Sequence, residues 1–135
     1  MVNPSDTMKR PLAVMMSRTL HTIAPEATLV EASQFICDVR VDSLLVSSHG
    51  HYLGIVTETD LVRKVMAESG DLSQRRVESV MSHSIVTIEI ERSISEASDL
   101  MAENGIRHLA VTQDGEIVVV ISVRDLLHFK NWGTL

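Results

Sequence analysis

Two stretches of the sequence place a hydroxyl side chain three residues before a carboxylate: Thr57 with Asp60, and Ser122 with Asp125. An ionised aspartate accepts hydrogen bonds, so one carboxylate can bind both adjacent hydroxyl groups of a ribose. A threonine or serine at a helix N-terminus can also join the backbone N–H groups there in holding a phosphate. The same spacing occurs in helices that are capped without any ligand. These residues therefore fit either a nucleotide site or simple helix capping.

The other polar residues give weaker indications of chemistry. His49 and His51 flank a predicted turn without a third ligand near them in the sequence, so we expect a solvated turn and no metal site. Cys37 is the only cysteine, and its place on a predicted amphipathic helix favours a small buried side chain over a nucleophile. No nucleophile elbow or nucleophile–base pair is recognisable in the sequence, so we expect neither catalysis nor a cofactor.

Composition narrows the class of protein. The 135 residues, 44% of them hydrophobic, suffice for one domain with a buried core. The formal net charge of −6 argues against a nucleic-acid surface, which requires a basic face. No apolar run approaches the roughly 20 residues that cross a bilayer, and residues 1–10 lack the apolar core of a secretory signal. We therefore expect a cytoplasmic protein without a membrane segment.

The chain repeats itself, and this repeat relates the two hydroxyl–carboxylate pairs. A shift of 65 residues aligns positions 16–62 with positions 81–127 without a gap. In this register Asp60 falls on Asp125, and Gly50 falls on Gly115. We therefore expect two copies of one supersecondary unit. The predicted boundaries are 8–68 for the first repeat, 69–76 for a linker and 77–130 for the second repeat.

Each copy has the pattern β-α-β-β-α after a short helical lead-in at residues 11–16 or 77–81. S/T-x-x-E capping boxes at Thr28 and Ser93 mark the start of the first helix. The expected strands are 21–23, 44–47 and 52–56 in the first copy, and 86–88, 108–112 and 117–121 in the second. Asp60 and Asp125 are therefore expected in the first turn of the last helix of each copy.

The residues between the last strand and the last helix resemble those of the cystathionine-beta-synthase (CBS) domain family. The hallmark of that family is G-h-x-T/S-x-x-D, where h is apolar. Residues 54–61 (GIVTETDL) match it, and residues 119–126 (VVISVRDL) match except that Val119 replaces the glycine. Residues 106–111 (IRHLAV) also resemble the family's entry into the second strand, with Ala110 in place of a usual proline.

The resemblance implies an α/β fold in which two β-α-β-β-α repeats pack sheet to sheet with pseudo-twofold symmetry. It also implies a non-catalytic regulatory module that binds an adenosine nucleotide (AMP, ADP or ATP) between the repeats and signals to an unknown protein partner. S-adenosylmethionine and dinucleotides remain open as ligands. A homodimer formed through the short last helices is expected. The alternative function is a structural or oligomerisation scaffold with vestigial clefts.

In that family each cleft combines residues of both repeats. For the Asp60 cleft the resemblance implies Thr57, Thr59, Asp60, Ile85, Val86, Ile106, Arg107 and His108. For the second cleft it implies Leu20, His21, Val41, Asp42, Ser122, Arg124 and Asp125. Asp42 and Arg107 occupy equivalent repeat positions with opposite charges, and a carboxylate repels phosphate. We therefore expect the Asp60 cleft to bind nucleotide more tightly, and we expect Val119 to crowd the second cleft.

Overall fold

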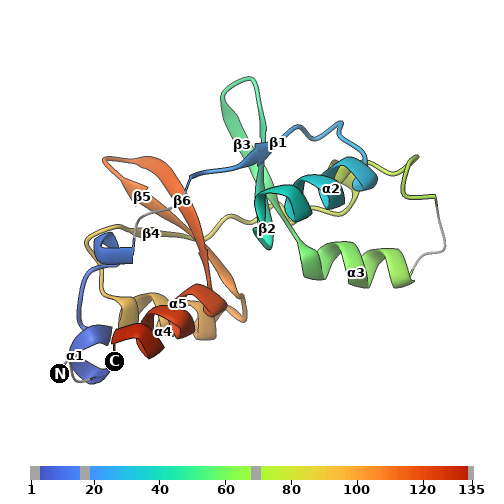
Figure 1. Ribbon diagram of the computed structural model, residues 1–135. Helices are drawn as coiled ribbons and strands as arrows, with labels where there is room; N and C mark the ends of the chain where they lie inside the picture. The colour runs from blue at the N-terminus through green and yellow to red at the C-terminus, as the bar shows by residue number, and fades with distance from the viewer. Residues whose placement is uncertain (1–3, 16–18, 68–70, 134–135) are drawn as a thin grey trace. The chain divides into compact units, whose positions relative to one another are not determined.

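The structure is a computed structural model that describes residues 4–15, 19–67 and 71–133, with side chains described from residue 6 to residue 128 of these ranges (Figure 1). The chain forms two compact units. The first-repeat unit consists of residues 21–85, and the second-repeat unit consists of residues 86–135 together with residues 1–20. The predicted order β-α-β-β-α is confirmed in both repeats, and so is the α/β fold class.

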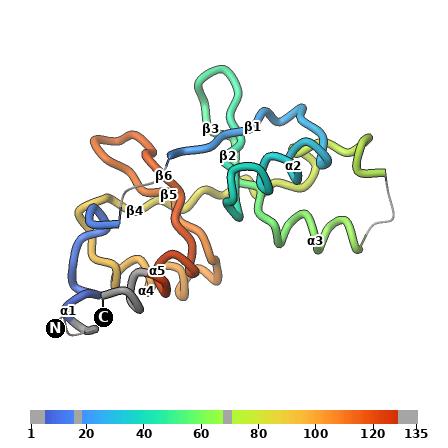
Figure 2. Tube along the Cα trace, in the orientation of Figure 1, coloured from blue at the N-terminus to red at the C-terminus, as the bar shows by residue number. Residues whose placement is uncertain are grey.

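The first-repeat unit contains a three-stranded sheet in the order β1-β2-β3. Its elements are β1 (Thr22–Ile23), α2 (Leu29–Val39), β2 (Ser43–Ser48), β3 (His51–Thr57), α3 (Glu58–Ala67) and the 3-10 helix η2 (Val77–Ser79). Strand β2 is parallel to β1 and antiparallel to β3. Helices α2 and α3 contact each other and lie beside the β2–β3 hairpin, whose tip extends away from them (Figure 2).

Local signals begin and end the helices of this unit. Thr28 and Glu31 form a complete capping box, because each side chain accepts a hydrogen bond from the backbone N–H of the other residue at 3.1 Å. Helix α2 ends at Val39, and the capping residue Arg40 that follows has a left-handed backbone with φ 58°. The core beneath these elements is formed by buried aliphatic side chains: Leu29, Ala32, Ile36, Leu44, Val46, Val56, Leu61, Val77, Val80 and Met81.

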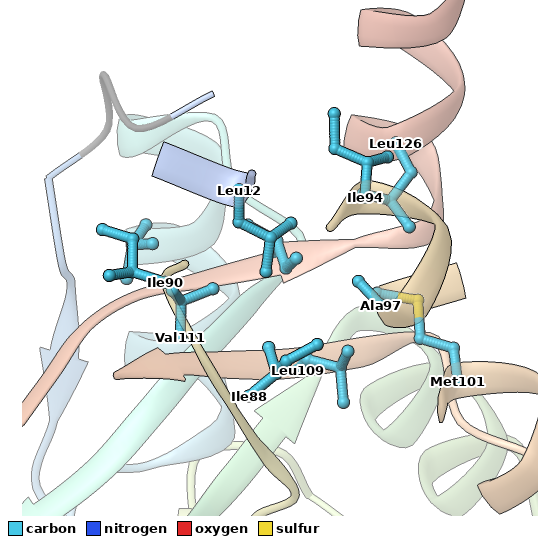
Figure 3. Packing of buried hydrophobic residues seen from close by; sticks show 11 residues of the cluster. Leu12, Ile88, Ile90, Ile94, Ala97, Met101, Leu109, Val111 and Leu126 are labelled. Carbon is cyan, nitrogen blue, oxygen red and sulfur yellow. The ribbon is translucent and has the colours of Figure 1, made fainter. Parts of the chain in front are cut away.

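The second-repeat unit repeats this topology with a sheet in the order β4-β5-β6. Its elements are α1 (Pro4–Met8), the 3-10 helix η1 (Leu12–Met15), β4 (Thr87–Glu89), α4 (Ile94–Asn104), β5 (His108–Gln113), β6 (Glu116–Ser122) and α5 (Val123–Gly133). Helix α1 contacts α4 and α5. Leu12 is fully buried among side chains of β4, α4, β5 and α5 (Figure 3).

The lead-in segments pack against the opposite repeat. The backbone N–H of Leu12 donates to the carbonyl of Arg92 at 2.8 Å, and that of Ile94 donates to the carbonyl of Arg10 at 3.0 Å. In the first-repeat unit, Val77 donates in the same way to Ala27 at 2.8 Å. Each compact unit therefore contains the lead-in of the other sequence repeat. The backbone groups of that lead-in form hydrogen bonds with the repeat that it joins, and its apolar side chains are buried there.

Two local expectations need correction. Cys37 is exposed on α2, so the prediction of a small buried side chain is wrong. At Ser93 the side chain accepts from the backbone N–H of Glu96 at 3.0 Å, but the carboxylate of Glu96 accepts from Arg92 at 3.4 Å. The second capping box therefore has only one of its two predicted hydrogen bonds, the one that the Ser93 side chain accepts.

Candidate functional site

The first hydroxyl–carboxylate motif lies where β3 turns into α3. The backbone N–H of Thr57 donates to Oδ2 of Asp60 at 3.1 Å, and the N–H of Asp60 donates to Oγ1 of Thr57 at 3.1 Å. This reciprocal pair satisfies two of the N–H groups that a helix start leaves without a partner. Helix capping at this position, one of the two sequence interpretations, is therefore confirmed.

The second motif has the same geometry between β6 and α5. The N–H of Ser122 donates to Oδ2 of Asp125 at 2.8 Å, and the N–H of Asp125 donates to Oγ of Ser122 at 3.2 Å. Ser122 and Asp125 are both buried, whereas Asp60 is half-buried. Capping engages one oxygen of each carboxylate, and an ionised carboxylate has about four acceptor positions. Capping by itself therefore does not use all the acceptor positions of either carboxylate.

The residue that precedes the second strand of each repeat contacts the last helix of its own repeat. The carbonyl of Asp42 accepts from the N–H of Glu58 at 3.0 Å, and the carbonyl of Arg107 accepts from the N–H of Val123 at 2.9 Å. Asp42 thus lies beside the first motif and Arg107 beside the second. The exposed side chain of Arg124 adds a further cation to the first turn of α5. The two helix starts therefore differ in charge within their own units.

The remaining predicted site residues are divided between the two units. Thr59 and Val41 belong to the first-repeat unit together with Ile85 and His21, while Leu20, Val86, Ile106 and His108 belong to the second-repeat unit. The ring of His21 packs edge-on against Phe35 with 5.7 Å between ring centroids. His108, which follows Arg107 in the sequence, is paired in register with Ser122 across β5 and β6. This pairing places His108 beside the second motif. Each predicted cleft joins residues of both units, so its composition stays a prediction.

The glycine of the hallmark motif has a structural role in the first repeat. A Cβ atom on Gly54 would lie 2.2 Å from the carbonyl oxygen of Ser82. Ser82 and Ile55 exchange two backbone hydrogen bonds, with N···O distances of 2.8 Å and 2.9 Å, so the chain after η2 needs this close approach to β3. At the equivalent position Val119 packs in the core of the second-repeat unit. Val119 therefore has a packing role in its own unit, and the expectation that it crowds a cleft stays a prediction.

Lys64, which is not among the residues predicted from the sequence, contacts the first motif. Its Nζ atom lies 4.0 Å from Oδ1 of Asp60, and it donates a hydrogen bond to the carbonyl of Val80. The Asp–Lys spacing of four residues on a helix is the sequence signal for the first contact. The contact with Val80 has no local signal, because it joins residues from α3 and the segment after η2.

Other site chemistries find no support in the described part of the chain. Within residues 4–15, 19–67 and 71–133, no three His, Cys, Asp or Glu side chains are arranged to hold a metal ion. Nor does any helix described there combine the length and apolarity that would carry it across a membrane.

Comparisons with known proteins identify the same repeat. The family model of the CBS domain matches residues 2–67 and 77–131. A solved structure of an uncharacterized conserved protein from Pyrococcus horikoshii is 30% identical, with a TM-score of 0.82 over 90% of this chain and 92% of that one. A hexameric CBS-CP12 protein from bloom-forming cyanobacteria is 31% identical, with a TM-score of 0.80 over 89% of this chain and 67% of that one.

Curated relatives are in part longer than this chain. An uncharacterized protein of Methanopyrus kandleri is 30% identical over 115 residues, which are 84% of this chain and 59% of that protein. A CBS domain-containing protein of Arabidopsis thaliana is 31% identical over 108 residues, which are 79% of this chain and 20% of that protein. The chain thus spans only part of the length of these relatives.

Proposed function

Because this chain belongs to the CBS domain family, we propose that it is a non-catalytic regulatory module that binds an adenosine nucleotide, namely AMP, ADP or ATP. Asp60 and Asp125 bind the ribose hydroxyl groups, and Thr57 and Ser122 assist at the phosphate. Binding changes the contacts of the module with a protein partner, which requires different nucleotide affinities in two states of the module. A cytoplasmic location, expected from the composition, is part of this proposal.

The observation that carries the proposal is the repetition of one polar geometry. Both repeats place a hydroxyl and a carboxylate at the N-terminus of the last helix, with matching hydrogen bonds between them. Each carboxylate is held in one orientation by its backbone hydrogen bonds, so a ligand hydroxyl meets an acceptor that is already positioned. The positive end of each helix dipole lies beside this acceptor and favours a phosphate there.

The experiment compares nucleotide binding by two aspartate variants and a capping control. Asp60→Ala and Asp125→Ala each remove a charged acceptor, which should weaken AMP binding at the altered site by about 30- to 150-fold. Glu31→Ala removes the same kind of capping carboxylate from α2, at a place without a proposed ligand. It should lower the thermal midpoint and leave AMP affinity unchanged. Calorimetric titration in which neither aspartate variant differs from Glu31→Ala contradicts the proposal.

Assembly is the second part of the proposal. On the last helices Val62, Met66 and Leu127 are 61%, 83% and 56% exposed. Val62 and Leu127 occupy equivalent repeat positions, so both helices present an apolar side chain at the same place. We expect a homodimer that covers these side chains, while the cyanobacterial relative is a hexamer. Sedimentation at micromolar concentration that gives the monomer mass of 14.9 kDa contradicts assembly.

A scaffold without a ligand is the competing function. The capping hydrogen bonds account for both aspartates without any nucleotide, and the exposed apolar residues favour a role in assembly. The two functions separate in one measurement, because a scaffold keeps its oligomeric state and shows no heat of binding with AMP, ADP or ATP. Val62→Glu together with Leu127→Glu tests the assembly surface and should leave nucleotide affinity at the aspartates intact.

A further inference from the structure

Lys64 joins three parts of the first-repeat unit. Its Nζ atom lies 4.0 Å from Oδ1 of Asp60 in the preceding turn of α3. The same atom donates a hydrogen bond to the carbonyl oxygen of Val80, and the backbone carbonyl of Lys64 accepts from Nη1 of Arg75 at 3.4 Å. The Lys64 side chain is 43% exposed and that of Asp60 is 22% exposed, so the ion pair is only partly shielded from water.

The segment that Lys64 holds is the path from the first repeat to the second. Val80 lies next to η2 and is fully buried. Two residues later Ser82 exchanges backbone hydrogen bonds with Ile55 of β3, directly beside Gly54. From there the chain continues to β4 of the second-repeat unit. A contact that ends on Val80 is therefore placed to link α3 to this connecting segment.

The two oxygens of Asp60 have different surroundings. Oδ2 accepts from the N–H of Thr57, whereas the Lys64 ammonium faces Oδ1. The capping function of Asp60 uses the first of these contacts and leaves the second unexplained. In the second repeat the position equivalent to Lys64 is Phe129, so the sequence does not repeat this cation.

We propose that Lys64 is a positioning residue for the nucleotide site at Asp60: it orients Oδ1 toward the ribose hydroxyl groups and couples their binding to the segment at Val80. This inference rests on the proposed function. Lys64 Nζ lies 4.0 Å from Oδ1, too far for a hydrogen bond, so Lys64 acts on this oxygen through its charge. A ribose hydroxyl that donates to a lone pair of Oδ1 then favours the same carboxylate orientation as Lys64 does. The hold of Lys64 on the Val80 carbonyl then depends on whether a nucleotide is bound.

The first test is a double-mutant cycle on AMP affinity, measured by calorimetric titration. Lys64→Met should weaken binding about three- to tenfold, the range of a partly exposed ion pair together with a charge-assisted hydrogen bond. Lys64→Arg keeps the charge and should stay within about twofold of the wild type. In an Asp60→Asn background, Lys64→Met should have less than about a twofold effect, because its action passes through Asp60.

The second test measures amide hydrogen exchange in the segment that connects the two units. AMP should change the exchange rate of the Ser82 amide in the wild type by about threefold or more, and Lys64→Met should abolish this response. Arg63→Met is the matched control, because it removes an exposed cation from the neighbouring position of α3. It should keep both the affinity and the response at Ser82.

The outcomes distinguish this inference from the function on which it rests. A wild-type protein that binds no AMP contradicts both. A wild type that binds AMP, with Lys64→Met equal to Arg63→Met in affinity and in the Ser82 response, contradicts the role of Lys64 alone. Equal losses from Lys64→Met in the wild-type and Asp60→Asn backgrounds also contradict it, since they indicate a general electrostatic or stability effect.

Discussion

Replacing Gly54 by alanine tests the close approach of the chain to β3 more directly than any other substitution. The added Cβ atom would lie 2.2 Å from the carbonyl oxygen of Ser82, 3.2 Å from the carbonyl carbon and 3.3 Å from Sδ of Met81. Non-bonded heavy atoms are most stable at about 3.5–4.0 Å, so the Ser82 backbone must retreat by roughly 1 Å or more. The nearest obstacle, the Ser82 carbonyl group, belongs to the backbone, so rotation of the Met81 side chain cannot relieve the clash.

The magnitude follows from the hydrogen bonds that this retreat breaks. Ile55 and Ser82 exchange two backbone hydrogen bonds, each worth about 0.5–1.5 kcal/mol net. Alanine also lowers the conformational entropy of the unfolded chain, which offsets about 0.4–1 kcal/mol of the lost stability. We therefore expect Gly54→Ala to lower the free energy of unfolding by about 1–2 kcal/mol. A matching decrease of several degrees in the thermal midpoint should be visible by circular dichroism.

Amide exchange locates the effect, and a second glycine supplies the control. Gly105→Ala adds the same methyl group where nothing lies within 4 Å, although the φ of 63° makes alanine strained there as well. Gly54→Ala should speed exchange at the Ser82 and Ile55 amides, and Gly105→Ala should leave both amides protected. If Gly54→Ala is as stable as the wild type and Ser82 remains protected, the close approach does not exist in solution.

Three further predictions concern the lead-in, a helix end and an arginine. Leu12→Ala should destabilise the second-repeat unit by about 2–4 kcal/mol, because Leu12 is fully buried there. Amide hydrogen exchange at Ile94 should become faster, while the amides of α2 stay protected. Faster exchange in α2 instead would contradict the packing of the first lead-in against the second repeat. Arg40→Gly should raise the free energy of unfolding by about 0.5–1 kcal/mol in urea denaturation, because φ of 58° suits glycine; a decrease would refute this. Arg107→Ala should weaken the affinity for ATP by about tenfold, and the affinity for AMP by less. If both affinities fall equally, Arg107 does not contact the additional phosphates.

The elements of each repeat could be predicted from the sequence because their signals are local. The capping box at Thr28 joins atoms three residues apart, and Gly50 and Gly115 occupy turns with φ of 78° and 80°. Cys37 shows the limit of such signals. Helical periodicity indicates which face of a helix is buried, but neighbouring positions differ by only about 100° in direction, and Cys37 lies just beyond the buried Ile36.

The candidate site was predictable only in part. The hydroxyl–carboxylate motifs and their place at the starts of α3 and α5 follow from spacing alone. Their sequence is compatible with both capping and ligand binding, and the structure adds that the capping hydrogen bonds are formed. The partners from other elements did not follow from spacing: Lys64 reaches Val80 across 16 positions of the chain.

By itself the sequence determined the order of strands and helices and the position of Asp60 and Asp125 in the first turn of equivalent helices, because capping and turns depend on atoms a few residues apart. Only the tertiary structure decided which repeat each lead-in joins. Both repeats carry similar apolar patterns, so the pattern around Leu12 or Val77 is compatible with either core. The choice depends on packing and backbone hydrogen bonds between residues far apart in the chain, such as those between Leu12 and Arg92, and no local signal encodes it.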